Sequence, residues 1–358
     1  MIDNFNSSKE FFASSNGYKG FISYFDLIFN AKDYKRLYIL KGGPGTGKST
    51  LMKKAAALAE ERGADYEVIR CSSDINSLDG VIIYTANGRR VGIIDGTAPH
   101  MRDTALPGCA DTLVDLGLGW DTGVLESSRE RIEELSKRKK IYYAKAYEYM
   151  SVSSVFADYI KAEIKKFFDI VGARAECRRI ISAVFEGKKS GRISKKLVSS
   201  FSDIGYYTLP TLDKISDKKY AVYGIHDSDK LILSMLVDEL YGMGADFCAI
   251  PSPFDKDTYE AVYFEDSRIS ITAGGVGERI LDSTAYITAP DAIENDIAID
   301  AIYNSRDLFL SYAAEKIADA KKCHFELEKI YSGAMDFSKI SEISDSILEE
   351  IGNIMNSV

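Results

Sequence analysis

The chain has 358 residues, 46% of them apolar and 28% charged, which is the composition of an ordinary globular protein long enough to form two domains. Its formal net charge of −9 disfavours nucleic acid or an anionic membrane surface as a partner, because both are bound through basic faces. Five scattered cysteines, a polar start at residues 1–10 and the lack of an apolar run of about 18 residues indicate a cytoplasmic protein without disulfides or a membrane span.

The first elements with a clear chemical role are a strand, a glycine-rich loop and a helix. Residues 37–40 are apolar and predict a buried strand, whereas residues 51–61 are rich in Ala, Leu, Lys and Glu and predict a helix. Between them lies a complete G-x-x-x-x-G-K-[ST] motif. The residues that we predict to bind nucleotide are Gly42, Gly43, Pro44, Gly45, Thr46, Gly47, Lys48, Ser49 and Thr50.

This segment resembles the phosphate-binding loop of the P-loop NTPases. Glycines allow the backbone to curl, so that successive N–H groups face phosphate oxygens at the start of the helix. We expect Lys48 to reach the β- and γ-phosphates and the Ser49 hydroxyl to ligate Mg²⁺. The resemblance implies a nucleoside triphosphate site and leaves the reaction open.

The next predicted strands end in polar residues that could complete the site. Residues 90–95 form an apolar strand ending in Asp95, which matches a Walker B element that holds Mg²⁺, although Asp95 could merely cap the following loop. Thr97 and His100 follow as candidate sensors of phosphate or water, or as structural loop residues. Asp74 and Asp79 lie in loops next to strand ends and could accept a proton from an acceptor hydroxyl, or could cap turns.

The predicted catalytic residues are therefore Lys48, Asp95, Asp74 and Asp79, and the predicted metal ligands are Ser49 and Asp95. No guanine-reading [NT]KxD motif follows the loop, so we expect ATP with Mg²⁺. Gly96 stands directly after Asp95, where many ATP-driven machines carry a glutamate, which disfavours a fast motor-type ATPase.

A long helical segment follows at about residues 126–186. The basic run 137–140 predicts a solvated helix surface. Arg174, Arg178 and Arg179 predict an exposed helix face, with a lid over phosphates as the alternative. Residues 187–192 are small, polar and basic, and we interpret them as a linker between two domains.

After this linker the pattern of the first half recurs. Residues 37–42 match residues 219–224, Lys48 then aligns with Lys230, and the helix stop at Gly63 matches Gly244 after a slip of one residue. The chemical residues have changed: Ile225, Asp227 and Asp229 replace loop glycines, Leu231 replaces Ser49 and Ala273 replaces Asp95.

We predict that the second copy keeps the fold without binding a triphosphate, because Asp227 and Asp229 would lie where phosphates must go. The alternative is that His226, Asp227 and Asp229 bind something else, such as a cation.

The two-copy layout, with the P-loop and residues 71–74, 78–80 and 95–100, resembles a bacterial family of tandem P-loop proteins described as ATPase-like. Repeat and resemblance together predict an α/β fold with two P-loop NTPase-like, three-layer αβα domains and mainly parallel sheets. The domains are residues 1–186 and 193–358. Each ends in a long helical segment, at about 126–186 and 291–356.

Three functions remain open at this stage. The first is a slow Mg²⁺-dependent ATPase with one working site in the N-terminal half and a structural or regulatory C-terminal half. The second is a small-molecule or nucleotide kinase. The third is a non-catalytic ATP-sensing scaffold that binds a protein partner through its helical segments. The sequence names neither the acceptor nor the oligomeric state.

Overall fold

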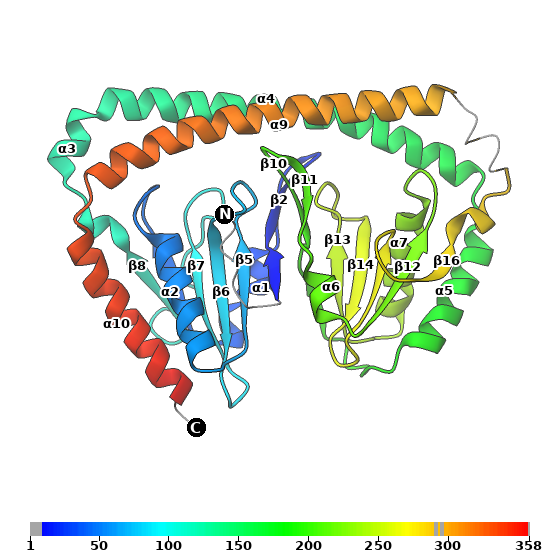
Figure 1. Ribbon diagram of the computed structural model, residues 1–358, viewed down its shortest axis with the longest axis horizontal. Helices are drawn as coiled ribbons and strands as arrows, with labels where there is room; N and C mark the ends of the chain where they lie inside the picture. The colour runs from blue at the N-terminus through cyan, green and yellow to red at the C-terminus, as the bar shows by residue number, and fades with distance from the viewer. Residues whose placement is uncertain (1–8, 290–292, 294–296, 357–358) are drawn as a thin grey trace.

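The computed structural model describes residues 9–289, 293 and 297–356, and this part of the chain contains two six-stranded sheets beneath two long helices (Figure 1). The first sheet has the order β1-β5-β6-β7-β4-β8, with β1 (Glu10–Phe12), β5 (Tyr66–Arg70), β6 (Leu78–Tyr84), β7 (Arg90–Asp95), β4 (Tyr34–Lys41) and β8 (Asp111–Asp115). The second has the order β9-β13-β14-β15-β12-β16, with β9 (Ile193–Lys195), β13 (Phe247–Pro251), β14 (Tyr259–Phe264), β15 (Ile269–Ala273), β12 (Lys218–Tyr223) and β16 (Glu278–Asp282).

Both sheets are mainly parallel, as predicted. In each, one strand makes the antiparallel pairs with its two neighbours: β6 in the first sheet and β14 in the second. The remaining pairs of both sheets are parallel. The two sheets therefore share one strand order and one set of strand directions.

The long helices cross from one half of the molecule to the other (Figure 1). Helix α2 (Lys48–Glu61) packs on the first sheet, and α7 (Ser228–Gly242) packs on the second. After α3 (Thr122–Ser127), α4 (Arg129–Lys166) leaves the first half, and α5 (Ile170–Val184) packs against α7. In return α9 (Ile297–Gly333) runs back beside α4, and α10 (Phe337–Asn356) packs against α2.

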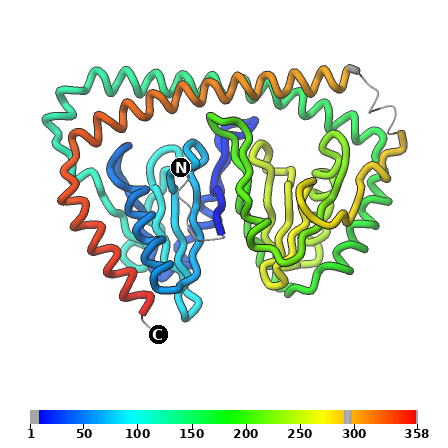
Figure 2. The backbone as a smooth tube through the Cα atoms, viewed as in Figure 1, coloured from blue at the N-terminus to red at the C-terminus, as the bar shows by residue number. Residues whose placement is uncertain are grey.

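The predicted helical segments thus exist, but each ends on the opposite half. Figure 2 shows the chain passing across both sheets twice, so that α10 lies beside the first sheet. The apolar side chains of α10 explain this position: Ile340, Ile347 and Ile351 join Leu51 and Met52 of α2 in one core. The predicted start of the second segment, at residue 291, lies outside the described residues.

The inner faces of the two sheets share a single core. It contains Ile39 and Ile94 of the first sheet, Ile250 and Ala261 of the second, and Phe25 of the short helix α1 (Phe25–Ile28). The short helix α6 (Thr211–Ile215) contributes to the same core. Each half is therefore not the separate three-layer αβα sandwich that the sequence predicted, because the two inner faces are buried jointly.

Smaller elements complete the fold. Two hairpins lie between the sheets and reach up to the long helices (Figure 1): β2 (Ser14–Gly17) with β3 (Gly20–Ser23), and β10 (Ser199–Ser202) with β11 (Gly205–Thr208). Three 3₁₀ turns are η1 (Ala31–Asp33), η2 (Leu116–Gly119) and η3 (Ser283–Tyr286). Within residues 9–289, 293 and 297–356, no helix is both long and apolar enough to cross a membrane.

Candidate functional site

The glycine loop connects the end of β4 to the start of α2, as the sequence predicted. Gly45 and Gly47 have φ values of 72° and 85°, in the left-handed region where a side chain is strained. Gly47 is the residue directly before the helix. The Lys48 ammonium folds back over the loop and donates to the carbonyl oxygens of Gly42 at 2.7 Å and Gly43 at 2.8 Å.

Asp95 lies beside this loop because β4 and β7 are parallel neighbours. Leu40 pairs with Asp95 in the sheet register, so both strands end at one edge. One carboxylate oxygen, Oδ1, accepts from the backbone N–H of Thr97 at 2.8 Å and from its hydroxyl at 2.6 Å. The other, Oδ2, lies 3.7 Å from Lys48 Nζ. Asp95 therefore caps its loop and also faces Lys48 of the glycine loop.

The donor set at this edge suits Mg²⁺ held together with a nucleotide. Ser49 Oγ accepts from Leu78 N at 3.1 Å and keeps a second lone pair, and Asp95 Oδ2 faces Lys48. Magnesium in nucleotide sites takes one or two protein oxygens and completes its shell with phosphates and water. Within the described residues, no group of three or more His, Cys, Asp or Glu side chains could hold a metal alone.

The other two predicted carboxylates are both engaged. Asp79 lies within β6 and not in a loop as predicted, and its Oδ2 lies 3.2 Å from His100 Nε2, with both side chains only 6% exposed. The His100 ring also packs on Phe25, with ring centroids 4.5 Å apart. Asp74 lies 3.4 Å from the ammonium of Lys321, which α9 supplies from the other half of the chain.

Two further residues at this site were missed in the sequence. In the basic run 137–140, Lys139 is half-buried while its three neighbours are exposed. Its ammonium lies 3.1 Å from Nδ1 of His324, a residue of α9. Burial, followed by the positive charges of Lys139 and Lys48, lowers the pKa of His324 to about 4. Neutral His324 can therefore accept a hydrogen bond from Lys139. The ammonium groups of Lys48 and Lys139 are both near enough to His324 to lower its pKa.

Helix α9 also covers the glycine loop directly. A Cβ atom on Gly45 would lie 2.9 Å from the backbone oxygen of Glu328 and 3.1 Å from Ser332 Cβ. A Cβ atom on Gly43 would lie 3.2 Å from the ring of Trp120. The glycine loop of the first half is therefore covered by a helix that begins in the second half.

We expect Gly45→Ala to destabilise the protein more than Gly63→Ala. Both glycines have left-handed backbones, so each substitution should cost about 1–2 kcal/mol from backbone strain. Only at position 45 would the methyl group also meet helix backbone, because Gly63 has open space around it. Denaturant unfolding of the two variants measures the difference. Equal destabilisation would show that α9 does not rest on the loop.

The two buried histidines predict opposite pH dependences of stability. Burial lowers the pKa of His100, but the Asp79 carboxylate outweighs it and raises this pKa above the usual 6.5. The His100–Asp79 pair should therefore stabilise the protein fully below pH 6.5 and lose that contribution as the pH rises through the raised pKa. His324, with its pKa lowered to about 4, should instead lose stability as the pH falls below 6.5.

Unfolding free energies of single variants across about pH 5 to 9 test this expectation. His100→Gln should reduce the loss of unfolding free energy at alkaline pH. His324→Gln should reduce the loss of unfolding free energy at acid pH. If both substitutions changed the pH profile in the same direction, the assignment of the two protonation states would be wrong.

The loop between β12 and α7, residues 224–227, is the counterpart of the glycine loop and is called the second loop. It differs from the glycine loop in backbone conformation as well as in composition. Helix α7 begins at Ser228, after His226 and Asp227, which have φ values of 52° and 61°. The ladder register places Ala273 opposite Val222 as Asp95 stands opposite Leu40, in agreement with the predicted replacement of Asp95.

The predicted alignment of Lys230 with Lys48 is wrong by one residue. The buried positions Leu51, Met52, Ala55, Ala56 and Ala59 of α2 correspond to Ile232, Leu233, Leu236, Val237 and Leu240 of α7. In this register Lys230 falls on Ser49. The one-residue offset between the two halves therefore arises in the loop before the helix and not at the helix stop, because the matching buried positions fix how α2 and α7 align.

The arginines of α5 lie on the second half of the molecule and not over the glycine loop. Arg174 and Arg178 form ion pairs with Glu239 of α7 at 3.2 Å and 2.8 Å, on the second half of the molecule. This agrees with the predicted helix face and not with a lid over phosphates.

Comparison with protein-family models, with curated proteins and with solved structures found no match.

Proposed function

We propose that the protein is an ATP-binding P-loop protein and a slow Mg²⁺-dependent ATPase, with one working site in its N-terminal half. The observation that carries the proposal is the meeting of the P-loop and Asp95 at one sheet edge, with Lys48 Nζ 3.7 Å from Asp95 Oδ2. In this proposal the loop and Lys48 bind the phosphates, while Ser49 and Asp95 hold Mg²⁺.

The charge distribution around the loop supports a polyanionic ligand. Lys48 and Lys139 both lie near the loop, and burial and the Lys48 charge lower the pKa of Lys139. Two cations at short range repel each other, and the negative charge of a triphosphate would remove this repulsion. Lys139 is then placed to stabilise charge on the terminal phosphate, and Lys321 of α9 orients Asp74.

We further propose that the two halves arose by duplication of one P-loop domain and that the second copy is degenerate. The shared strand order of the two sheets and the matching buried faces of α2 and α7 support this view. The crossing of α4 and α9 supports a structural or regulatory role for the second half, because α9 covers the P-loop.

Titration calorimetry and turnover assays test the proposal together. We expect one ATP per chain, and we expect Asp95→Asn to reduce Mg²⁺-dependent ATP hydrolysis far more than ATP binding in EDTA. The reason is that Asp95 would act through the metal, whereas the loop and Lys48 bind phosphates directly. Equal turnover in wild type and Asp95→Asn would remove Asp95 from the mechanism, and two ATP per chain would contradict the single site.

A further inference from the structure

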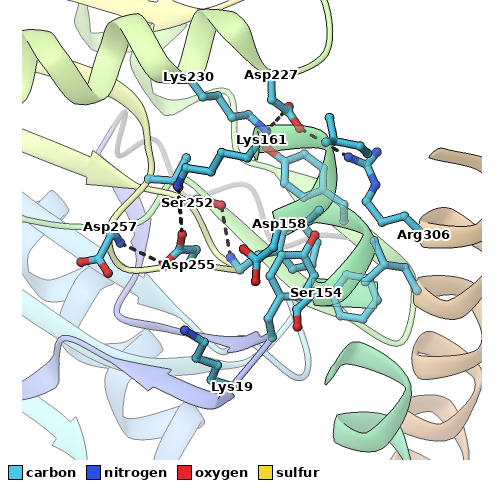
Figure 3. A pocket seen from close by; sticks show the side chains of 18 of the residues that line it. Lys19, Ser154, Asp158, Lys161, Asp227, Lys230, Ser252, Asp255, Asp257 and Arg306 are labelled. Carbon is cyan, nitrogen blue, oxygen red and sulfur yellow. Dashed lines mark hydrogen bonds and ion pairs between the residues drawn. The ribbon is translucent and has the colours of Figure 1, made fainter. Parts of the chain in front are cut away.

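A cavity of about 840 Å³ lies over the second loop (Figure 3). Helices α4, α7 and α9, both hairpins and the loop 252–258 form its walls. Its volume falls within the range of about 300–1,000 Å³ that is usual for small-molecule sites. It also lies where β12 and β13 end, which is the sheet edge at which α/β proteins bind ligands.

Inside this cavity two cations from different helices hold one carboxylate. Lys230 Nζ of α7 lies 3.0 Å from Asp227 Oδ1, and Arg306 Nη1 of α9 lies 3.4 Å from Asp227 Oδ2 (Figure 3). A lysine and an arginine that meet the two oxygens of one anion form the arrangement by which proteins bind a compact oxyanion, either a carboxylate or a phosphate group.

A ligand anion could replace the Asp227 carboxylate between Lys230 and Arg306. Its side chain is 45% exposed, so the carboxylate can turn into water when a ligand anion replaces it between Lys230 and Arg306. It makes no hydrogen bond that caps α7, although it stands directly before the helix. Asp227 and His226 are successive non-glycine residues in left-handed conformation, and such strain is typically retained where it serves a site.

The remaining walls favour a small molecule with a ring and one anionic group. The rings of Tyr18 and Phe254 are stacked with centroids 4.9 Å apart, and Phe254 stacks on Tyr206 at 5.9 Å. Lys161 of α4 reaches in beside them and contacts Thr258 Oγ1 at 3.3 Å and Asp255 at 3.9 Å. The carboxylates Asp158, Asp255 and Asp257 in the cavity wall disfavour a polyphosphate.

We propose that Lys230 and Arg306 form a binding site for the single carboxylate or phosphate group of a ring-containing small molecule, and that Asp227 occupies this site in the absence of that ligand. The ligand displaces the Asp227 carboxylate to solvent, and its ring lies against the Tyr18–Phe254–Tyr206 wall. The proposal goes beyond ATP binding in the first half and does not depend on it.

The test measures binding of inorganic phosphate, phenyl phosphate and benzoate by calorimetry, in a Lys48→Ala background that disables the proposed ATP site. Asp227→Asn removes the internal anion and keeps a residue that tolerates left-handed backbone. We expect this variant to bind at least one of the three probes at least about tenfold more tightly, since the charge-assisted bonds that Lys230 and Arg306 Nη1 make to Asp227 are freed, while Arg306 Nε keeps its pair with Asp307. Adding Lys230→Met should abolish the gain.

Asp257→Asn is the matched control, since it removes the same charge from the cavity wall without touching Lys230 or Arg306. Preference for phenyl phosphate or for benzoate distinguishes a phosphate ligand from a carboxylate ligand. The proposal is overturned if a folded Asp227→Asn protein gains no affinity for any of the three probes, or if Asp257→Asn gains as much. If Asp227→Asn does not fold, Asp227→Gly gives the same decision, since glycine adopts this backbone freely.

Discussion

Lys48→Ala is expected to weaken ATP binding strongly and to leave the fold intact. The contacts of the ammonium seen among the described residues are all with groups of the site: the carbonyl oxygens of Gly42 and Gly43, and the Asp95 carboxylate. Its removal therefore leaves the apolar core unchanged but takes away the lysine that would bind the β- and γ-phosphates. Loss of such charge-assisted hydrogen bonds corresponds to about 100-fold weaker binding.

The protein carries its own reporter for this measurement. Trp120 is the single tryptophan of the chain, and its ring lies against Gly43 of the loop. We expect ATP to change its fluorescence in the wild type and not in Lys48→Ala. At a hundredfold excess over Kd, ATP should also stabilise the wild type by about 2.7 kcal/mol.

Lys54→Ala is the matched control, because Lys54 is an exposed lysine on the same helix. It should bind ATP as the wild type does, which would separate the effect of position 48 from a general loss of positive charge. Unchanged ATP affinity in a folded Lys48→Ala protein would show that the glycine loop is not the nucleotide site.

The elements that could be predicted are those fixed by local sequence. The strand, glycine loop and helix around Lys48 follow from residues next to one another, and their positions agree with the prediction. Asp95 lies beside the loop because an apolar run ended in a carboxylate and the two strands are parallel neighbours. Whether these residues bind ATP stays a prediction.

Features that depend on distant contacts could not be predicted. The run 137–140 looks uniformly solvated, and only the return of α9 brings His324 to Lys139. The crossing of α4 and α9 has no local signal, because an apolar helix face does not say which half it will cover. The alignment of Lys230 failed because the shortened loop could be matched from either end, and the buried face of α7 decides the register.

The largest expected loss of stability comes from an ion pair that joins the two halves. Lys196 follows β9 of the second sheet, and its ammonium lies 2.7 Å from Glu67 Oε2 on β5 of the first. Both side chains are less than 10% exposed, at 9% and 6%. Burial alone would raise the pKa of Glu67, but Lys196 holds it below its usual value.

We therefore expect Lys196→Met to destabilise the protein by about 3–5 kcal/mol, because it leaves the Glu67 carboxylate buried without the ammonium that pairs with it. The hydroxyl of Tyr84, 2.9 Å from Glu67 Oε1, can offset only a small part of this loss. The double variant Lys196→Met with Glu67→Leu should regain most of the stability, since burying an apolar pair requires no charge compensation.

Denaturant unfolding of the two single variants and the double variant measures the coupling between the residues. Arg129→Met is the control, because Arg129 pairs with Glu133 on an exposed helix face and should cost nothing measurable. If Lys196→Met cost no more than Arg129→Met, the two sheets would not be held together through this pair. If the double variant were as unstable as Lys196→Met, the loss would come from lost packing of the lysine stem and not from the unpaired carboxylate.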